Sequence, residues 1–121
     1  MPRILVIDDD RGIREVLHLL LQERGYDVEI AGDGEQAIEL LAMSTGFDLV
    51  ITDIRMPVTD GNEVARYVRT SLKQDVSLVA MTGFSDEIEK GLFDYSIEKP
   101  FRLEALDKII RSVVQKNARH E

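Results

Sequence analysis

The 121-residue chain has no cysteine and no tryptophan, and its basic residues are outnumbered by its acidic ones. Without cysteine, disulfides, thiol catalysis and thiolate metal sites are excluded. The 15 lysines and arginines against 23 aspartates and glutamates leave a net charge of −8. This balance argues against direct nucleic-acid binding, because neutralising phosphates requires clustered positive charge.

Long apolar runs are missing as well. No stretch approaches the roughly 18–20 apolar residues of a membrane-spanning helix, and Met1-Pro2-Arg3 runs into a strand-like segment rather than a signal peptide. We therefore expect a cytoplasmic protein with no membrane contact. With 44% hydrophobic and 31% charged residues, the composition is that of a globular chain. The length corresponds to one domain, which we place over residues 1–121.

Short apolar segments alternate with helical patterns along the whole chain. Strands are expected at residues 3–7, 26–31, 47–52, 76–81 and 96–98. Apolar residues at helical spacing lie within 13–21, 37–41, 64–72 and 103–114. This (βα)₅ alternation predicts an α/β fold, a flavodoxin-like doubly wound sheet of five parallel strands in the order 2-1-3-4-5.

The interval between the fourth and fifth strands is unusually short. Residues 83–94 must hold a loop, a helix and a second loop, whereas a mean helix takes about 11 residues and each connection about 2–6 more. We therefore expect the fourth helix to be shortened to at most about two turns, or irregular.

Acidic residues follow two of the predicted strands. Asp8, Asp9 and Asp10 follow the first strand, and Asp53 follows the third. In the predicted order these strands are neighbours about 4.8 Å apart, and ligands of such sheets bind beyond the carboxyl ends where the order reverses. Two carboxylates ~5 Å apart repel by roughly 3 kcal/mol at an effective dielectric of 20. The cluster therefore either takes up a proton or binds a hard cation, for which Mg²⁺ is the better candidate.

Two further polar residues follow the last two strands. Thr82 offers a hydroxyl and Lys99 a flexible ammonium. Together with the carboxylates they are typical of a phosphoryl-transfer site, with Asp53 as a candidate nucleophile.

Each of these residues also has an ordinary structural explanation. Asp8, Asp9 and Asp10 could cap the helix that follows them, and Asp53 could be a turn residue. The Thr82 hydroxyl could hydrogen-bond backbone groups at the end of its strand, and Lys99 could be a solvated surface lysine. Their shared position at the strand ends favours the functional interpretation.

The same residues resemble the receiver domain of bacterial response regulators, the phosphoacceptor modules of two-component signalling. The resemblance rests on residues 4–10 (ILVIDDD), 53–61 (DIRMPVTDG), 81–83 (MTG) and 99–101 (KPF). It implies that Asp53 accepts a phosphoryl group from a histidine kinase or phosphotransfer protein. It also implies that Asp9 and Asp53 bind Mg²⁺ directly, Asp8 mainly through water, and that the backbone carbonyl of Arg55 completes the protein ligands.

The resemblance assigns roles to the remaining site residues. Thr82 is expected to hydrogen-bond the phosphoryl group, Lys99 to pair with it, and the Lys99–Pro100 bond to be cis. Receivers promote their own phosphorylation and dephosphorylation, but their output is a conformational switch. The expected partner of that switch is a downstream protein, or a second copy of the chain in a homodimer. A conventional turnover enzyme is therefore not expected.

The sequence departs from the family around the fifth strand. Most receivers carry an aromatic residue three positions before the lysine, where this chain has Ser96, with Tyr95 beside it. We expect the signal to leave through another face, or through order and disorder of residues 83–94. Arg55 and Phe84 occupy family positions that tune access of hydrolytic water, and we expect them to shield the acyl phosphate.

Two other functions remain open. A small phosphatase of the haloacid-dehalogenase type also uses Asp, Thr, Lys and Mg²⁺, but Gly12 stands where its motif has Thr or Val, and the late acidic pair is missing. A degenerate receiver that binds partners without phosphorylation would not need the full set of site residues. Continuous substrate turnover would indicate the phosphatase, and one stoichiometric phosphoryl label would indicate the receiver. No label at all would indicate the degenerate receiver.

Overall fold

The computed structural model describes residues 2–43, 46–72 and 75–119. Its strands are β1 (Arg3–Ile7), β2 (Asp27–Ala31), β3 (Leu49–Asp53), β4 (Ser77–Thr82) and β5 (Tyr95–Glu98). Its helices are α1 (Arg11–Glu23), α2 (Gly34–Met43), α3 (Gly61–Ser71) and α4 (Leu103–Arg119), with a 3₁₀ turn, η1 (Ser85–Glu87), before β5. All strand pairs are parallel and the order is β2-β1-β3-β4-β5, which confirms the predicted topology.

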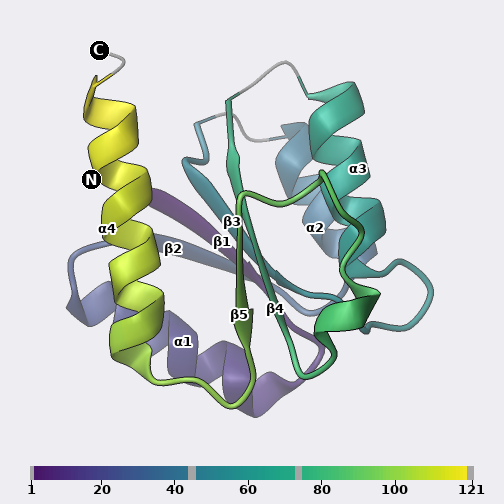
Figure 1. Cartoon of the computed structure of the whole chain (residues 1–121), viewed down its shortest axis with the longest axis horizontal. Helices are drawn as coiled ribbons and strands as arrows, with labels where there is room; N and C mark the ends of the chain where they lie inside the picture. Colours follow the sequence, from purple (N-terminus) through teal and green to yellow (C-terminus); the bar gives the residue numbers. More distant parts are fainter. Residues whose placement is uncertain (1, 44–45, 73–74, 120–121) are drawn as a thin grey trace.

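Helices cover both faces of the sheet (Figure 1). Side chains alternate along each strand, so Ile4 and Val6 pack with α1 and α4 on one face, while Leu5 and Ile7 pack with α2 and α3 on the other. Burial on both sides explains why these strands are continuous apolar runs rather than alternating ones. In the part of the chain that the structure describes, no helix is long and apolar enough to cross a membrane.

β1 has the predicted boundaries, and the other four strands differ from theirs by one or two residues at one or both ends. β3 begins at Leu49 rather than at residue 47 and continues through Asp53, which the sequence assigns to the following loop. Phe47 is nevertheless buried at 3% exposure, so its apolar side chain belongs to the core without strand backbone. Asp53 extends the strand because it still pairs with Met81 of β4.

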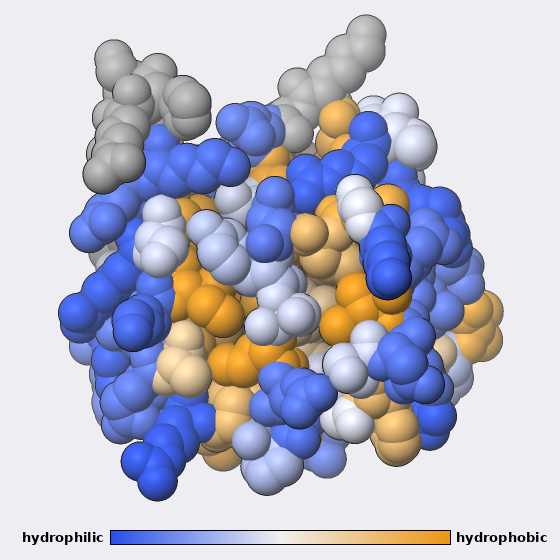
Figure 2. Space-filling model, in the orientation of Figure 1, coloured by the Kyte–Doolittle hydropathy of each residue, from blue (hydrophilic) through white to orange (hydrophobic). Residues whose placement is uncertain are grey.

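The β4–β5 connection, residues 83–94, contains no α-helix. Only the three-residue turn η1 is regular, so the expectation of an irregular fourth helix is confirmed. Tyr95 and Ile97 pack into the core beneath α4, and strand alternation places Ser96 and Glu98 on the opposite face, where both are exposed. Figure 2, in the orientation of Figure 1, shows apolar surface gathered between the hydrophilic surfaces of α4 and α3.

The loop between β3 and α3 has a strained turn. Val58 adopts a φ of 70°, and Thr59 N donates to Pro57 O at 2.9 Å across it, which is the hydrogen bond of a γ-turn. Three residues later Gly61 begins α3, where an added Cβ would lie 2.2 Å from the Asp53 carbonyl oxygen. Only glycine therefore allows α3 to start this close to the end of β3.

Relieving the strain at Val58 should stabilise the protein. A non-glycine residue at such a φ costs about 1–3 kcal/mol, whereas glycine costs about 0.5–1 kcal/mol through the unfolded chain. Because Val58 is 86% exposed, Val58→Gly loses little buried area. We expect a gain of about 1 kcal/mol in the free energy of unfolding, measured in urea. Val58→Ala keeps a Cβ at the same φ and should gain less; equal stabilities would contradict the strain.

Candidate functional site

The predicted site residues meet at one edge of the sheet. Because all strands run parallel, Asp8 after β1, Asp53 and Thr82 at the ends of β3 and β4, and Lys99 after β5 lie on the same side. Thr82 follows Met81, the register partner of Asp53, and the Thr82 carbonyl accepts the Lys99 amide at 2.9 Å. The sheet order therefore assembles the site from four strands.

Three of the four predicted acidic residues form one cluster. Asp8, Asp9 and Asp53 each offer a carboxylate oxygen, and these oxygens lie within 4.8 Å of one another. Asp8 and Asp53 are buried, whereas Asp9 is exposed. Asp10 lies outside this set: its Oδ1 accepts the Ile13 amide at 3.2 Å and caps α1, so for this residue alone the capping interpretation is correct.

The buried carboxylates are oriented by backbone donors. Asp8 Oδ1 accepts the Asp10 amide at 2.9 Å, and Asp53 Oδ1 accepts the Ile54 amide at 2.8 Å. In both residues the second oxygen faces Lys99, so the two side chains converge on one point.

Lys99 joins the two buried acids. Its Nζ lies 2.9 Å from Asp8 Oδ2 and 3.2 Å from Asp53 Oδ2, so it is not a solvated surface lysine. Burial raises the pKa of Asp53, and the charge of Lys99 opposes that rise without cancelling it. Burial lowers the pKa of Lys99, but hydrogen bonds and charges from Asp8 and Asp53 outweigh it, so the net pKa of Lys99 is raised. The lysine is therefore held as a cation.

The cluster has the chemistry of a magnesium site. Its ligand atoms are carboxylate oxygens, which hard cations prefer, and the exposed Asp9 leaves a solvent-facing side on which Mg²⁺ keeps water or phosphate oxygens. The donor set therefore fits Mg²⁺. A role for the Arg55 carbonyl as a further ligand stays a prediction.

Thr82 stands at the edge of the cluster. Thr82 is 1% exposed, and its Oγ1 accepts a hydrogen bond from the Phe84 amide at 3.0 Å. Accepting this bond leaves the hydroxyl proton free to be donated to another oxygen.

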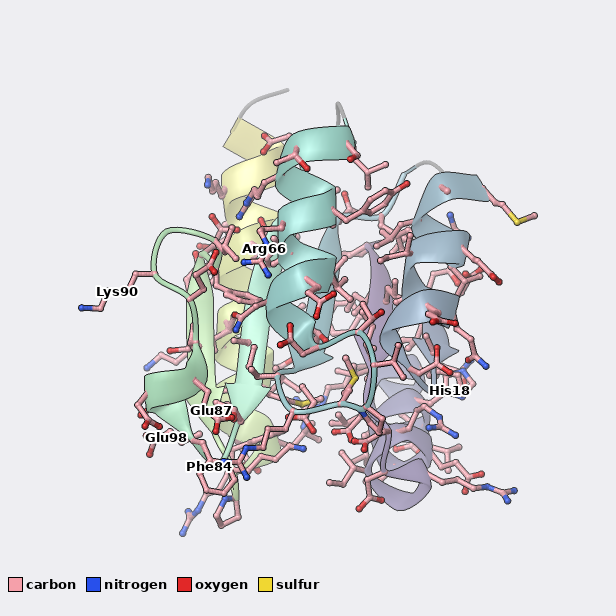
Figure 3. The ribbon with its side chains drawn as sticks, turned by 90° about the vertical axis from the view of Figure 1, so that its right-hand side faces the viewer. His18, Arg66, Phe84, Glu87, Lys90 and Glu98 are labelled. Atoms are coloured by element: carbon pink, nitrogen blue, oxygen red, sulfur yellow. The ribbon has the colours of Figure 1, made fainter. Side chains whose placement is uncertain are left out.

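Other contacts beside the site were not anticipated. Arg14 Nη1 donates to the Asp8 carbonyl at 2.8 Å, which ties α1 to the end of β1. The Arg55 guanidinium stacks 3.7 Å from the centre of the Phe84 ring and pairs with Glu87 through Nε at 2.7–2.8 Å and through Nη2. Figure 3 shows Phe84 and Glu87 close together below α3. The Asp53 and Thr82 motifs point to Arg55 and Phe84 separately, but no local pattern signals their contact.

The doubly wound sheet, with a carboxylate cluster and a lysine at its topological switch point, defines the class of flavodoxin-like receiver domains. The family model "Response regulator receiver domain" matches residues 4–111. The chain therefore belongs to the response regulator receiver family of two-component signalling.

Known proteins agree with this assignment over nearly the whole chain. Response regulator MprA of Mycolicibacterium vanbaalenii is 41% identical over a match that covers 96% of this chain and 52% of MprA. The crystal structure of response regulator TrrA from Thermotoga maritima, in complex with Mg²⁺-BeF, is 34% identical over 93% of this chain and 99% of that one, with a TM-score of 0.84. TrrA in complex with histidine kinase ThkA is 36% identical, with a TM-score of 0.81 and coverage of 93% and 98%.

The chain spans about half the length of the curated relatives it matches. The likeness therefore concerns the receiver domain of those proteins.

Proposed function

We propose that this chain is a phosphoacceptor: Asp53 accepts a phosphoryl group from a histidine kinase or phosphotransfer protein, and the modified domain regulates a downstream protein. The observation that carries the proposal is the bridge from Lys99 Nζ to Asp8 and Asp53 inside the carboxylate cluster. A buried nucleophilic carboxylate, a fixed cation and a free hydroxyl are the groups that phosphoryl transfer to an aspartate requires.

Each residue has a step to perform. A carboxylate oxygen of Asp53 attacks phosphorus, the new O–P bond forms, and the bond to the donor's leaving group breaks with its electron pair. Lys99 then pairs with one phosphoryl oxygen, and the Thr82 hydroxyl donates to another. Mg²⁺ held by Asp8, Asp9 and Asp53 would supply positive charge to offset the developing negative charge. Because the product stays on the protein, the domain is not a turnover enzyme.

Two structures of one relative, TrrA, support the proposed chemistry and partner. TrrA is described in complex with Mg²⁺-BeF and in complex with the histidine kinase ThkA. In this chain an apolar groove opens beside Lys99, and we assign it to the phosphodonor protein because it adjoins the phosphoacceptor. Its apolar lining comes from α1 and from the residues after β5: Ile13, Val16, Leu17, Leu20, Pro100, Phe101 and Leu103.

Labelling by a small phosphodonor tests the proposal. We expect acetyl phosphate with Mg²⁺ to add one phosphoryl group per chain, seen by intact mass, and EDTA to prevent it, because the carboxylate cluster repels the donor without a divalent cation. Continuous release of phosphate from a model monoester would instead indicate a phosphatase. Absence of a label with properly folded protein would indicate a binding module that works without phosphorylation.

A further inference from the structure

The β4–β5 connection, residues 83–94, is fastened to α3 by side chains. Asn62 Nδ2 donates to the Glu87 carbonyl at 2.8 Å, and Asn62 Oδ1 accepts the Glu89 amide at 3.0 Å. One turn further along the helix, Arg66 pairs with the Glu89 carboxylate. These contacts tie the middle of the connection to one face of α3.

A third residue on the same helix face holds the end of the connection. Arg69 Nε donates to the Leu92 carbonyl at 3.0 Å, and its Nη2 lies 2.8 Å from Asp94 Oδ2. Asn62, Arg66 and Arg69 are spaced by four and three residues, so they form one stripe along α3. This stripe makes one face of α3 a continuous attachment surface for the connection.

The connection has little structure of its own. Among the described residues, its internal backbone bonds are Glu87 N to Phe84 O and Ile88 N to Ser85 O, and Asp94 N bonds to Leu78 O of β4. Residues 83–86, 89 and 90 are exposed, and Figure 3 shows Lys90 extending away from the protein. A segment with few backbone bonds and exposed attachments belongs to the part of a fold that opens most easily.

The first attachment leads directly to the phosphoacceptor. Arg55 lies two residues beyond Asp53, contacts Phe84 and pairs with Glu87. Phe84 in turn donates its amide to Thr82 Oγ1, the hydroxyl that the proposed function assigns to the phosphoryl group. The segment is therefore tied at its start to both sides of the site.

We propose that phosphorylation of Asp53 detaches the β4–β5 connection from α3, because Arg55 exchanges the Glu87 carboxylate for phosphoryl oxygens. This inference rests on the proposed function of Asp53. A phosphoryl group carries about −1.5 to −2 charges and three acceptor oxygens, and arginine binds such oxygens in a bidentate manner. Glu87 competes with one negative charge, in a pair whose side chains are 60% and 32% exposed, where ion pairs are weak.

Loss of this pair weakens the rest of the attachment. When Thr82 Oγ1 turns to the phosphoryl group, the Phe84 amide loses its acceptor, and the Phe84 ring loses Arg55. Detachment then uncovers Asn62, Arg66 and Arg69 on α3. Such a switch needs no aromatic ring at position 96, which agrees with the exposed Ser96 of this chain.

Hydrogen exchange of the whole chain, with and without Mg²⁺ and beryllofluoride, tests the inference. We expect peptides within residues 84–94 to exchange about two- to fivefold faster with the phosphoryl mimic, the factor that loss of an exposed ion pair corresponds to. Peptides from α4, residues 103–114, should not change. Glu87→Gln should speed exchange of 84–94 without the mimic and reduce the further change, and Arg66→Gln, which removes the pair with Glu89 in the middle of the segment, should do the same.

Glu98→Gln is the matched control, since it removes one exposed carboxylate from the adjacent strand and should leave exchange in 84–94 unaltered. Phosphoryl labelling with unchanged exchange of 84–94 would overturn the inference and leave the proposed function standing. Absence of both labelling and beryllofluoride binding would overturn the proposed function and, with it, the inference.

Discussion

Asp53→Asn is expected to abolish labelling by acetyl phosphate completely. The amide cannot act as the anionic nucleophile, and the other carboxylates of the site do not replace it: Asp8 is fully buried with Lys99 against it, and Asp9 faces solvent. The measurement is intact mass after incubation with the phosphodonor and Mg²⁺. Burial raises the pKa of Asp53 in the metal-free site, whereas Mg²⁺ held by the cluster would favour the ionised carboxylate, which is the form that attacks.

Asp10→Asn provides the control for this variant. Asp10 belongs to the same run of acids, but its side chain caps α1 instead of entering the cluster. Because asparagine caps helices about as well as aspartate, Asp10→Asn should keep both labelling and stability. A label that survives in Asp53→Asn would mean that the phosphoacceptor is not the residue at the end of β3. A label that also disappears in Asp10→Asn would mean that its loss is not specific to Asp53.

The parts of the site that lie at strand ends could be predicted from sequence. A parallel sheet brings the carboxyl ends of its strands together whatever the details of packing, so Asp8, Asp53, Thr82 and Lys99 needed only the correct strand order. The length of the 83–94 interval likewise predicted an irregular crossover, because too few residues were present for a helix and two loops.

The contacts of the crossover itself could not be predicted. Glu87 pairs with Arg55 across 32 positions of sequence, and Arg69 reaches Asp94 across 25. Such pairs depend on the path of an irregular segment. Glu87 and Asp94 lie in that segment, and neither belongs to a periodic pattern that would predict its position. The sequence also could not predict that Asp9 joins the carboxylate cluster while Asp10 caps α1. Adjacent acids at the start of a helix suit either capping or metal binding.

The largest effect on stability is expected for Lys99→Met. In the absence of divalent cations this variant leaves the buried carboxylates of Asp8 and Asp53 without their ammonium. Removing one partner of a buried ion pair costs about 3–5 kcal/mol. Because Lys99 is 22% exposed, we expect the lower end, about 3 kcal/mol at neutral pH, measured by urea unfolding in EDTA. Lys90→Met, which changes a lysine extending into solvent, should stay within about 0.5 kcal/mol of wild type.

The pH dependence of the Lys99→Met deficit identifies its cause. With the lysine gone, the pKa of Asp53, already raised by burial, should rise further. A raised folded-state pKa means that protonation favours the fold, so stability is gained below the unfolded pKa and lost as pH rises through the folded one. The deficit should therefore shrink toward acidic pH. In the wild type the contribution of the Lys99 ammonium is also lost in the alkaline range, as pH rises through the raised pKa of Lys99.

Mg²⁺ should restore stability to Lys99→Met more than to the wild type. A cation that binds the folded cluster and not the unfolded chain stabilises the fold by mass action, and without the lysine it meets no competing positive charge between Asp8 and Asp53. A deficit that neither acid nor Mg²⁺ reduces would mean that Lys99 acts through packing of its aliphatic chain. A deficit that both reduce would establish that the lysine and the metal neutralise the same carboxylates, and that the acidity of this edge of the sheet is what attracts them.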